Sequence, residues 1–207
     1  MSGEPARPAP AWFVQLFAHR RWIRRTEPFP HIYARDVFTA GFYDRLLAET
    51  ARVRAGTTDD VSLWTLRDGP LAVFTSREWH DLIAGLTDLP VSGEITGLLR
   101  HHPAGSPAEQ PRTGLRRTVF PAHALVLLFH LGSDQWRPGE GGETALYPAA
   151  ADDAPALVAP LANSLVLFEC TSHTWHRYLG GNRGAGDSVM MWLHRPHDTE
   201  GDEHGRR

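Results

Sequence analysis

Lysine is absent from this chain, so all 21 of its Lys and Arg residues are arginine, and it has only one cysteine, Cys170. A single cysteine excludes an internal disulfide bond and a metal site made of several cysteines. No apolar run reaches the roughly 18 residues that a membrane-spanning helix requires. The N-terminal segment MSGEPARPAP lacks the basic region and apolar core of a secretory signal. We therefore expect a cytoplasmic protein with no membrane partner.

The chain also lacks a strong net charge, at −3, and 22% of its 207 residues are charged. This balance gives no basic surface of the kind that binds nucleic acids. With 42% hydrophobic residues, a chain of this length forms one domain with a substantial core. We expect an N-terminal arm and helix over 1–27, a single domain over 28–196 and a polar tail over 197–207. The composition carries no signal for the oligomeric state.

The first half of the chain is predicted to be mainly helical. The segment 11–25, AWFVQLFAHRRWIRR, places apolar residues near one face of a helix and adds four arginines. Such a helix binds a membrane surface or an anion, or it packs on the domain with its arginines exposed. Its short length, and the way it leads directly into the domain, favour packing.

Further elements are expected before residue 101. Thr39 is suited to cap a helix over 40–54, which Gly56 would end. The other predictions are a short strand at 31–33, a strand pair within 61–74 that turns at Asp68-Gly69, a helix over 77–87 capped by Ser76, and a helix over 92–100.

The second half of the chain is predicted to be β-structure. The run HALVLLFHL, 123–131, is too apolar for an exposed strand and indicates a core strand. Further short strands are expected at 143–147, 157–158, 164–168 and 187–195. Helices followed by about eight short strands indicate an α+β fold, a jelly-roll-like barrel with the N-terminal helices packed on it.

Four segments stand out over residues 28–196: PFPHIYARDVFTAGFYDRLLAE, LVLLFHL with GEGGETALYP, NSLVLFECTSHTWH and DSVMMWLHRP. In sequence and in order, they resemble the prolyl-hydroxylase-like branch of the 2-oxoglutarate and Fe(II)-dependent oxygenases. The resemblance implies a double-stranded β-helix, a barrel of the cupin kind. It also implies an iron site and an oxoglutarate site in the mouth of that barrel.

The family's iron is held by a His-x-Asp or His-x-Glu motif and a distal histidine, which leave open positions for oxoglutarate and O2. His176 matches the distal histidine. The His-x-Asp motif aligns with Arg117-Thr118-Val119. In a second register of the alignment, it falls at Arg112-Thr113-Gly114. Neither of these segments contains the motif's histidine. The second register resembles that of family halogenases, where Gly or Ala replaces the carboxylate. The resemblance therefore implies that His176 is the one matched iron ligand.

The family also pairs oxoglutarate with a basic residue on the last strand. That position falls at Gly186 to Ser188, where the sequence has no Arg or Lys. The iron motif and the cosubstrate arginine are thus both missing. We expect no cofactor, or Fe(II) and 2-oxoglutarate if the ligands lie elsewhere in the sequence.

Strand alternation places Ala124, Val126, Leu128 and His130 on one face, which the resemblance makes the barrel interior. His176 and Arg117 are expected at the same mouth. Two imidazoles beside a guanidinium suit acid–base chemistry or anion binding. We therefore predict a catalytic cluster of His130, His176 and Arg117, with the alternative that His130 is a hydrogen-bonded core residue.

Other polar and aromatic side chains are expected near the mouth. His173 and His176 would bind a metal only if a third ligand, His123 or Glu143, converged on them. The residues expected to contact substrate are Trp136, Thr144, Trp175, Arg177 and Arg183.

Three functions follow from these residues. The first is a repurposed barrel that catalyses a non-oxidative cyclisation, elimination or isomerisation of a small polar or anionic metabolite. The second is a non-catalytic binding protein on the same scaffold. The third is an Fe(II)- and oxoglutarate-dependent hydroxylase or halogenase whose ligands lie elsewhere. The first is favoured, although a fold alone does not determine function.

Overall fold

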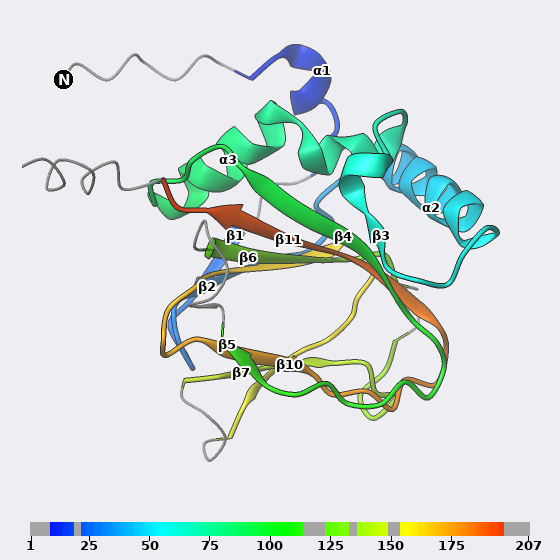
Figure 1. Cartoon of the computed structure of the whole chain (residues 1–207), viewed down its shortest axis with the longest axis vertical. Coiled ribbons are helices and arrows are strands. Elements are labelled where there is room, and N and C mark those ends of the chain that lie inside the picture. Colours follow the sequence, from blue (N-terminus) through cyan, green and yellow to red (C-terminus); the bar gives the residue numbers. More distant parts are fainter. Residues whose placement is uncertain (1–8, 19–21, 114–122, 133–135, 149–153, 197–207) are drawn as a thin grey trace, which may run out of the picture.

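The structure is a computed structural model that describes residues 9–18, 22–113, 123–132, 136–148 and 154–196. It contains two antiparallel sheets that face each other, with the helices on the outer face of the larger one (Figure 1). This mixture of helices and a large antiparallel sheet agrees with the predicted α+β class. Among the described residues, no helix is both long and apolar enough to cross a membrane.

The larger sheet has seven strands in the order β1-β2-β9-β6-β11-β4-β3. Their bounds are β1 Trp22–Arg25, β2 His31–Ala34, β9 Ser164–Glu169, β6 His123–His130, β11 Gly186–His194, β4 Ile95–His102 and β3 Val61–Ser62. The smaller sheet has the order β5-β10-β7-β8, with β5 Arg112–Thr113, β10 Trp175–Tyr178, β7 Thr144–Tyr147 and β8 Ala156–Val158. The core strands predicted near β6, β7, β8, β9 and β11 are confirmed.

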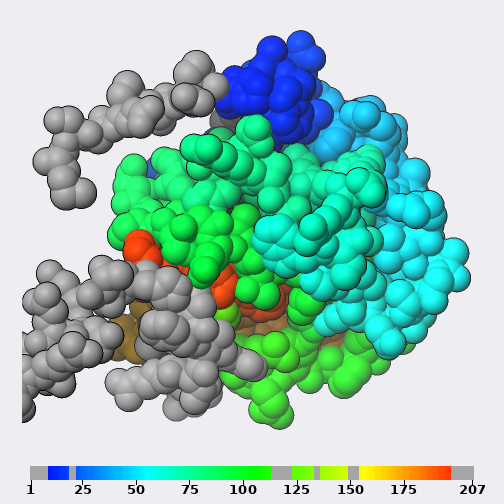
Figure 2. All heavy atoms as spheres, turned by 45° about the horizontal axis from the view of Figure 1, so that its top comes forward, coloured from blue at the N-terminus to red at the C-terminus, as the bar shows by residue number. Residues whose placement is uncertain are grey.

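Among the described residues before β4 there are five helical segments: α1 Ala11–Val14, α2 Ala40–Arg54, the 3-10 helices η1 Leu63–Thr65 and η2 Pro70–Thr75, and α3 Arg77–Thr87. They lie over one face of the large sheet, which Figure 2 shows from the helix side. The helices predicted over 40–54 and 77–87 are confirmed. The Ser76 hydroxyl accepts a bond from the Trp79 amide as predicted, whereas Thr39 makes no side-chain cap bond.

Three predicted elements are wrong. The helix over 11–25 stops at Val14, and Trp22–Arg25 form β1, because this segment pairs along β2. In place of the strand pair predicted within 61–74, the structure has β3 and two 3-10 helices. Pro70 favours the start of a helix, and Glu49 caps η2 by accepting a hydrogen bond from the Leu71 amide at 2.6 Å.

The helix predicted over 92–100 is replaced by strand β4. Ile95 and Leu99 are buried four residues apart, which fits a helix as well as a strand. Pairing along the length of β11 decides the outcome, because it satisfies the backbone of this segment in the sheet.

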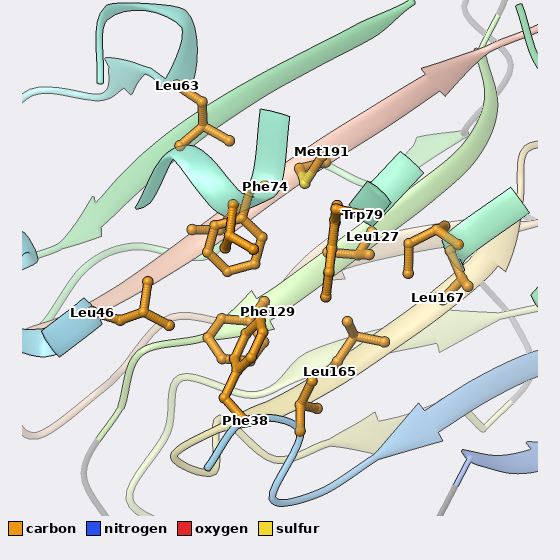
Figure 3. Packing of buried hydrophobic residues seen from close by; sticks show 14 of the residues in the cluster. Phe38, Leu46, Leu63, Phe74, Trp79, Leu127, Phe129, Leu165, Leu167 and Met191 are labelled. Carbon is orange, nitrogen blue, oxygen red and sulfur yellow. The ribbon is translucent and has the colours of Figure 1, made fainter. Parts of the chain in front are cut away.

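The core has two layers, one on each face of the large sheet. In the first, side chains of β6, β9 and β11 meet those of the helices, and Phe38 packs on both Trp79 and Phe129 (Figure 3). The second layer lies between the two sheets and includes Val126 and Leu128. Alternation along β6 separates these layers, because successive side chains point to opposite faces of a strand.

Ala124 departs from the predicted alternation and packs in the helix-side layer rather than with Val126. The pairing with β11 explains this exception. Leu193 pairs with Leu125, but the next residue, His194, pairs with His123, so Ala124 is the extra residue of a β-bulge.

A matched pair of leucines tests this division between core and surface. Leu127 on β6 is fully buried, whereas Leu157 on β8 is 57% exposed. Leu127→Ala should lower the free energy of unfolding by about 2–5 kcal/mol, because it leaves a cavity in the core. Leu157→Ala should change it by less than about 0.5 kcal/mol. Urea unfolding measures both, and equal losses in the two variants would contradict the assignment of the core.

Candidate functional site

A cavity of about 140 Å³ lies between the two sheets, lined by β4, β6 and β11 on one side and by β7 and β10 on the other. Since a water takes up about 30 Å³ in the liquid, the cavity has room for several waters or for a small metabolite. Its position at one end of the sheets is set by polar residues that interrupt the apolar layer.

On the large sheet, three of these polar residues form one row. Ser188 on β11 pairs in register with Arg100 on β4 and with His130 on β6, and all three line the cavity. Because neighbouring strands lie about 5 Å apart, the row spans about 10 Å between its outer backbones. A substrate lying along this row would therefore contact the arginine end, the hydroxyl and the imidazole.

On the small sheet, His176 and Tyr178 of β10 point into the cavity, as strand alternation requires. The His176 ring lies 5.3 Å from the ring of Phe168, which belongs to the apolar layer between the sheets. In the sheet itself, His176 pairs in register with Leu146 on β7 and with Arg112 on β5. The imidazole therefore lies between the apolar layer and the cavity.

His130 and His176 are buried, at 5% and 6% exposure, yet not all of their ring nitrogens are satisfied. Among the residues that the structure describes, His130 Nε2 and both nitrogens of His176 have no hydrogen-bond partner. Unpaired buried polar atoms are costly, so a site that retains them is suited to a ligand that supplies the missing bonds.

Both of these imidazoles are neutral at pH 7. Burial lowers the pKa of His130 to about 4, with a further contribution from the charge of His102. Burial also lowers the pKa of His176 to about 4, aided by Arg112 and Arg100 and opposed by Glu109. A neutral imidazole accepts a proton at one nitrogen and donates one at the other, which suits it to acid–base work.

An aromatic pair forms another part of the wall. The His102 ring stacks on Tyr178 with 3.9 Å between ring centroids. Burial is the largest cause that lowers the pKa of His102 to about 4, followed by the charge of Arg100. Burial, together with the charge of Glu109, raises the pKa of Tyr178 to about 12. At pH 7 this wall is therefore uncharged, with a phenol that stays protonated.

The predicted site residues separate into three groups. Trp136, Thr144 and Arg183 line the cavity together with His130 and His176. Trp175 and Arg177 alternate with His176 along β10 and are not among the lining residues. The Arg177 guanidinium instead lies 5.5 Å from the ring centroid of Tyr147. Arg117, the third member of the predicted cluster, lies outside the described residues.

Sequence reasoning missed Arg100, His102, Glu109 and Tyr178, all of which line the cavity. The predicted helix over 92–100 ended with Arg100, and no helix or strand was predicted for the other three. The signal for Arg100 and His102 was their spacing of two, which puts both on one face of a strand.

Comparison with known proteins identifies the fold. No family model and no curated protein matches the sequence. Among solved structures, a prolyl 4-hydroxylase from Phytophthora capsici matches with 21% identity and a TM-score of 0.67, over 86% of this chain and 62% of that chain. The chain thus spans less than two thirds of the length of that protein.

Two further matches are proteins of nogalamycin biosynthesis. The non-heme α-ketoglutarate-dependent epimerase SnoN matches with 15% identity and a TM-score of 0.60, over 86% of this chain and 84% of that one. The non-heme α-ketoglutarate-dependent carbocyclase SnoK matches with 13% identity and a TM-score of 0.57, over 83% of this chain and 84% of that chain. The chain has a 2-oxoglutarate oxygenase-like fold.

The residues of this oxygenase-like fold do not fit the iron that its relatives' names imply. No group of three His, Cys, Asp or Glu side chains among the described residues is placed to hold a metal ion. The register partner of His176 on β5 is Arg112, a cation that disfavours a divalent metal at this imidazole. The segment 114–122, which the structure leaves undescribed, contains no His, Cys, Asp or Glu.

The alternative metal ligands do not join His176 either. His173 is exposed in the turn before β10. His123 stacks on Trp192, with ring centroids 5.6 Å apart, and it is not among the residues that line the cavity. Among the described residues, His176 is therefore not joined by the further ligands that a metal centre requires.

The buried imidazoles predict a stability that depends on pH. The pKa of His130 and of His176 is about 4 in the folded protein, below the ordinary value of 6.5. The unfolded chain therefore binds more protons between pH 6.5 and 4, so stability is complete above pH 6.5 and falls as the pH drops towards 4. The full loss is about 3 kcal/mol per imidazole.

Urea unfolding between pH 7 and 4.5 measures this loss. His130→Asn should flatten the pH dependence of the free energy of unfolding relative to the parent protein. His173→Asn, at an exposed histidine three residues from His176, is the control and should leave the slope unchanged. An identical slope in the parent protein and the His130 variant would show that His130 is not buried in its neutral form.

Proposed function

We propose that this chain is an enzyme that uses His176 and His130 to move protons on a small polar molecule, without iron or oxoglutarate. The observation that supports the proposal best is the pair of buried, uncharged imidazoles with unpartnered nitrogens on one cavity. In this proposal the two facing sheets form the double-stranded β-helix of the oxygenase-like fold, and the cavity is its mouth.

In the reaction, an unprotonated nitrogen of His176 removes a proton from a C–H or O–H group of the substrate. The His130 N–H donates a proton to the atom that gains electron density, so that charge does not accumulate on the substrate. Such positioned acid–base groups contribute about 10²–10⁴-fold each to a rate. An isomerisation, a cyclisation or an elimination requires these transfers and no oxidant.

The wall residues give the substrate its orientation. Leu128 and Met190 offer apolar contact, while Ser188 and Thr144 offer hydroxyl groups, and all four line the cavity. Trp136 is held by a bond from its Nε1 to the Gly141 carbonyl at 2.9 Å, which fixes the indole at the wall. Polar groups placed in an apolar wall are typical of small-molecule sites.

The similar structures support this reaction class. Two of them are described as an epimerase and a carbocyclase, so the fold serves rearrangement and ring closure in other proteins. Those proteins are also described as α-ketoglutarate dependent, and in this respect the present chain differs in its proposed chemistry. A small-molecule substrate and a cytoplasmic location are part of the proposal.

Solvent isotope incorporation tests the proposal. Incubating the protein with a panel of small polar metabolites in D2O, without added iron, should place deuterium in one of them as proton transfer proceeds. His176→Gln should reduce the rate by about 10²-fold or more, because it removes the base and retains much of the side-chain volume. His173→Gln is the matched control and should retain the rate. Mass spectrometry of the recovered compounds measures the incorporation.

Anaerobic titration with Fe(II) and 2-oxoglutarate provides the opposing measurement. A visible charge-transfer band, or succinate formed from oxoglutarate in air, would establish the oxygenase alternative and rule out the proposal. If the His176→Gln variant still incorporates deuterium at the parent rate, a residue other than His176 removes the proton. Saturable binding of a metabolite without turnover would favour the non-catalytic binding protein.

A further inference from the structure

Arg100 is the one arginine in the polar row of the large sheet, and its side chain is only 15% exposed. Arg100 lies on β4, where it pairs in register with Ser188 of β11. Ser188 is in the segment where the family resemblance implies an oxoglutarate-binding basic residue, which this sequence lacks. A guanidinium in such a place is suited to bind a carboxylate of a ligand. Whether it does so depends on the groups that already surround it.

Those groups occupy the guanidinium. Arg100 Nη2 donates directly to Glu109 Oε1, and Nε donates to Asp60 Oδ2 at 3.3 Å. The third nitrogen, Nη1, lies 3.9 Å from the Met190 sulfur. A carboxylate from the chain itself is therefore bonded where a ligand carboxylate would bind.

Glu109 is ionised in this position. Burial alone would raise the pKa of its carboxyl group, but the hydrogen bond and charge of Arg100, together with Arg112, outweigh burial and hold this pKa below its usual value. Its second oxygen lies 3.7 Å from Arg112 Nη2. Glu109 thus links two arginines, and its side chain is only 20% exposed.

The backbone holds Glu109 in the cavity independently of its side chain. The Glu109 amide donates to the Tyr178 carbonyl at 2.9 Å, and the Gly181 amide donates to Ser106 at the same distance. Gly180 makes this close approach feasible: a Cβ there would lie 2.5 Å from the Ser106 oxygen, and its φ of 71° favours glycine. The loop is therefore fixed against β10, with Glu109 directed at Arg100.

The remaining charged residues of the described cavity wall are also paired. Glu140 lies 3.7 Å from Arg183, and Asp187 accepts from Arg54 at 2.7 Å. The three wall histidines are uncharged at pH 7, for the reasons given above. A charged ligand would meet no unpaired counter-charge among the described wall residues, and it would lose its hydration without compensation.

We infer that Glu109 is an internal counter-ion that fills the anion-binding position of Arg100, so that the cavity accepts an uncharged substrate rather than a carboxylate. The assignment of a substrate class rests on the function proposed above, whereas the exclusion of anions rests on the Arg100–Glu109 pair and on the pairing of the other charged residues of the described wall. The substrate is then a neutral polar molecule that hydrogen-bonds His130 and His176 and contacts Leu128 and Met190.

Succinate and its neutral analogue succinamide are suitable probes, with isothermal titration calorimetry as the measurement. The parent protein should show no saturable binding of succinate up to about 10 mM. Glu109→Ala removes the internal carboxylate and opens space beside Arg100, so it should bind succinate at least tenfold more tightly than the parent does. Its affinity for succinamide should not increase by a similar factor.

Two variants control this experiment. Glu109→Gln removes the charge and keeps the volume, so it should gain succinate binding to a smaller degree and serves if Glu109→Ala is unstable. Glu140→Gln also removes a carboxylate from an arginine, but the Arg183 side chain is 75% exposed and water screens it, so this variant should gain no binding.

Saturable binding of succinate by the parent protein that is lost in Arg100→Gln would overturn the inference, because a ligand would then displace Glu109. Failure of both Glu109 variants to gain succinate binding, with thermal unfolding showing that they are folded, would overturn it as well. Neither result depends on turnover, so the failure of this inference is distinct from the failure of the proton-transfer function.

Discussion

The pairing of β11 with β4 on one side and with β6 on the other is the constraint on which the cavity depends. It brings Arg100, Ser188 and His130 into one row although they come from three distant parts of the chain. A shift of one residue in either ladder would turn one of these side chains to the helix face. The apolar layers on both faces of the sheet resist such a shift, since Leu127 and Phe129 would then leave the core.

The loops beside the cavity are held differently, with one amide side chain making several of their bonds. Asn182 Nδ2 donates to the carbonyls of His102, Pro103 and Gly184, and its Oδ1 accepts from the Ser106 amide. These bonds join the end of β4 to the loop between β10 and β11. The cavity therefore combines a sheet floor with loops that are joined by the Asn182 side chain and by backbone hydrogen bonds.

The sequence predicts the parts of this arrangement that depend on local pattern. The apolar run of β6 and the capped helix α3 carry their own signals, and alternation placed His130 on the cavity face with Leu128. The same reasoning failed for Ala124, because a β-bulge is set by the partner strand and not by the residue itself. It also failed for β4, whose spacing fits a helix until β11, nearly ninety residues later, supplies a partner. Glu109 was beyond prediction for the same reason, as its role depends on Arg100 and on the loop contacts with β10.

The attachment of the Glu109 loop through backbone bonds has an evolutionary consequence. Since the amide of residue 109 and the glycine at 180 hold the loop against β10, the placement of its backbone does not depend on the side chain at 109. A single-codon change at this position would alter the charge that the pocket presents, while the histidines and the sheets stay in place. Under the function proposed above, a lineage with this scaffold would change its preference between charged and uncharged metabolites by substitution at this one loop residue.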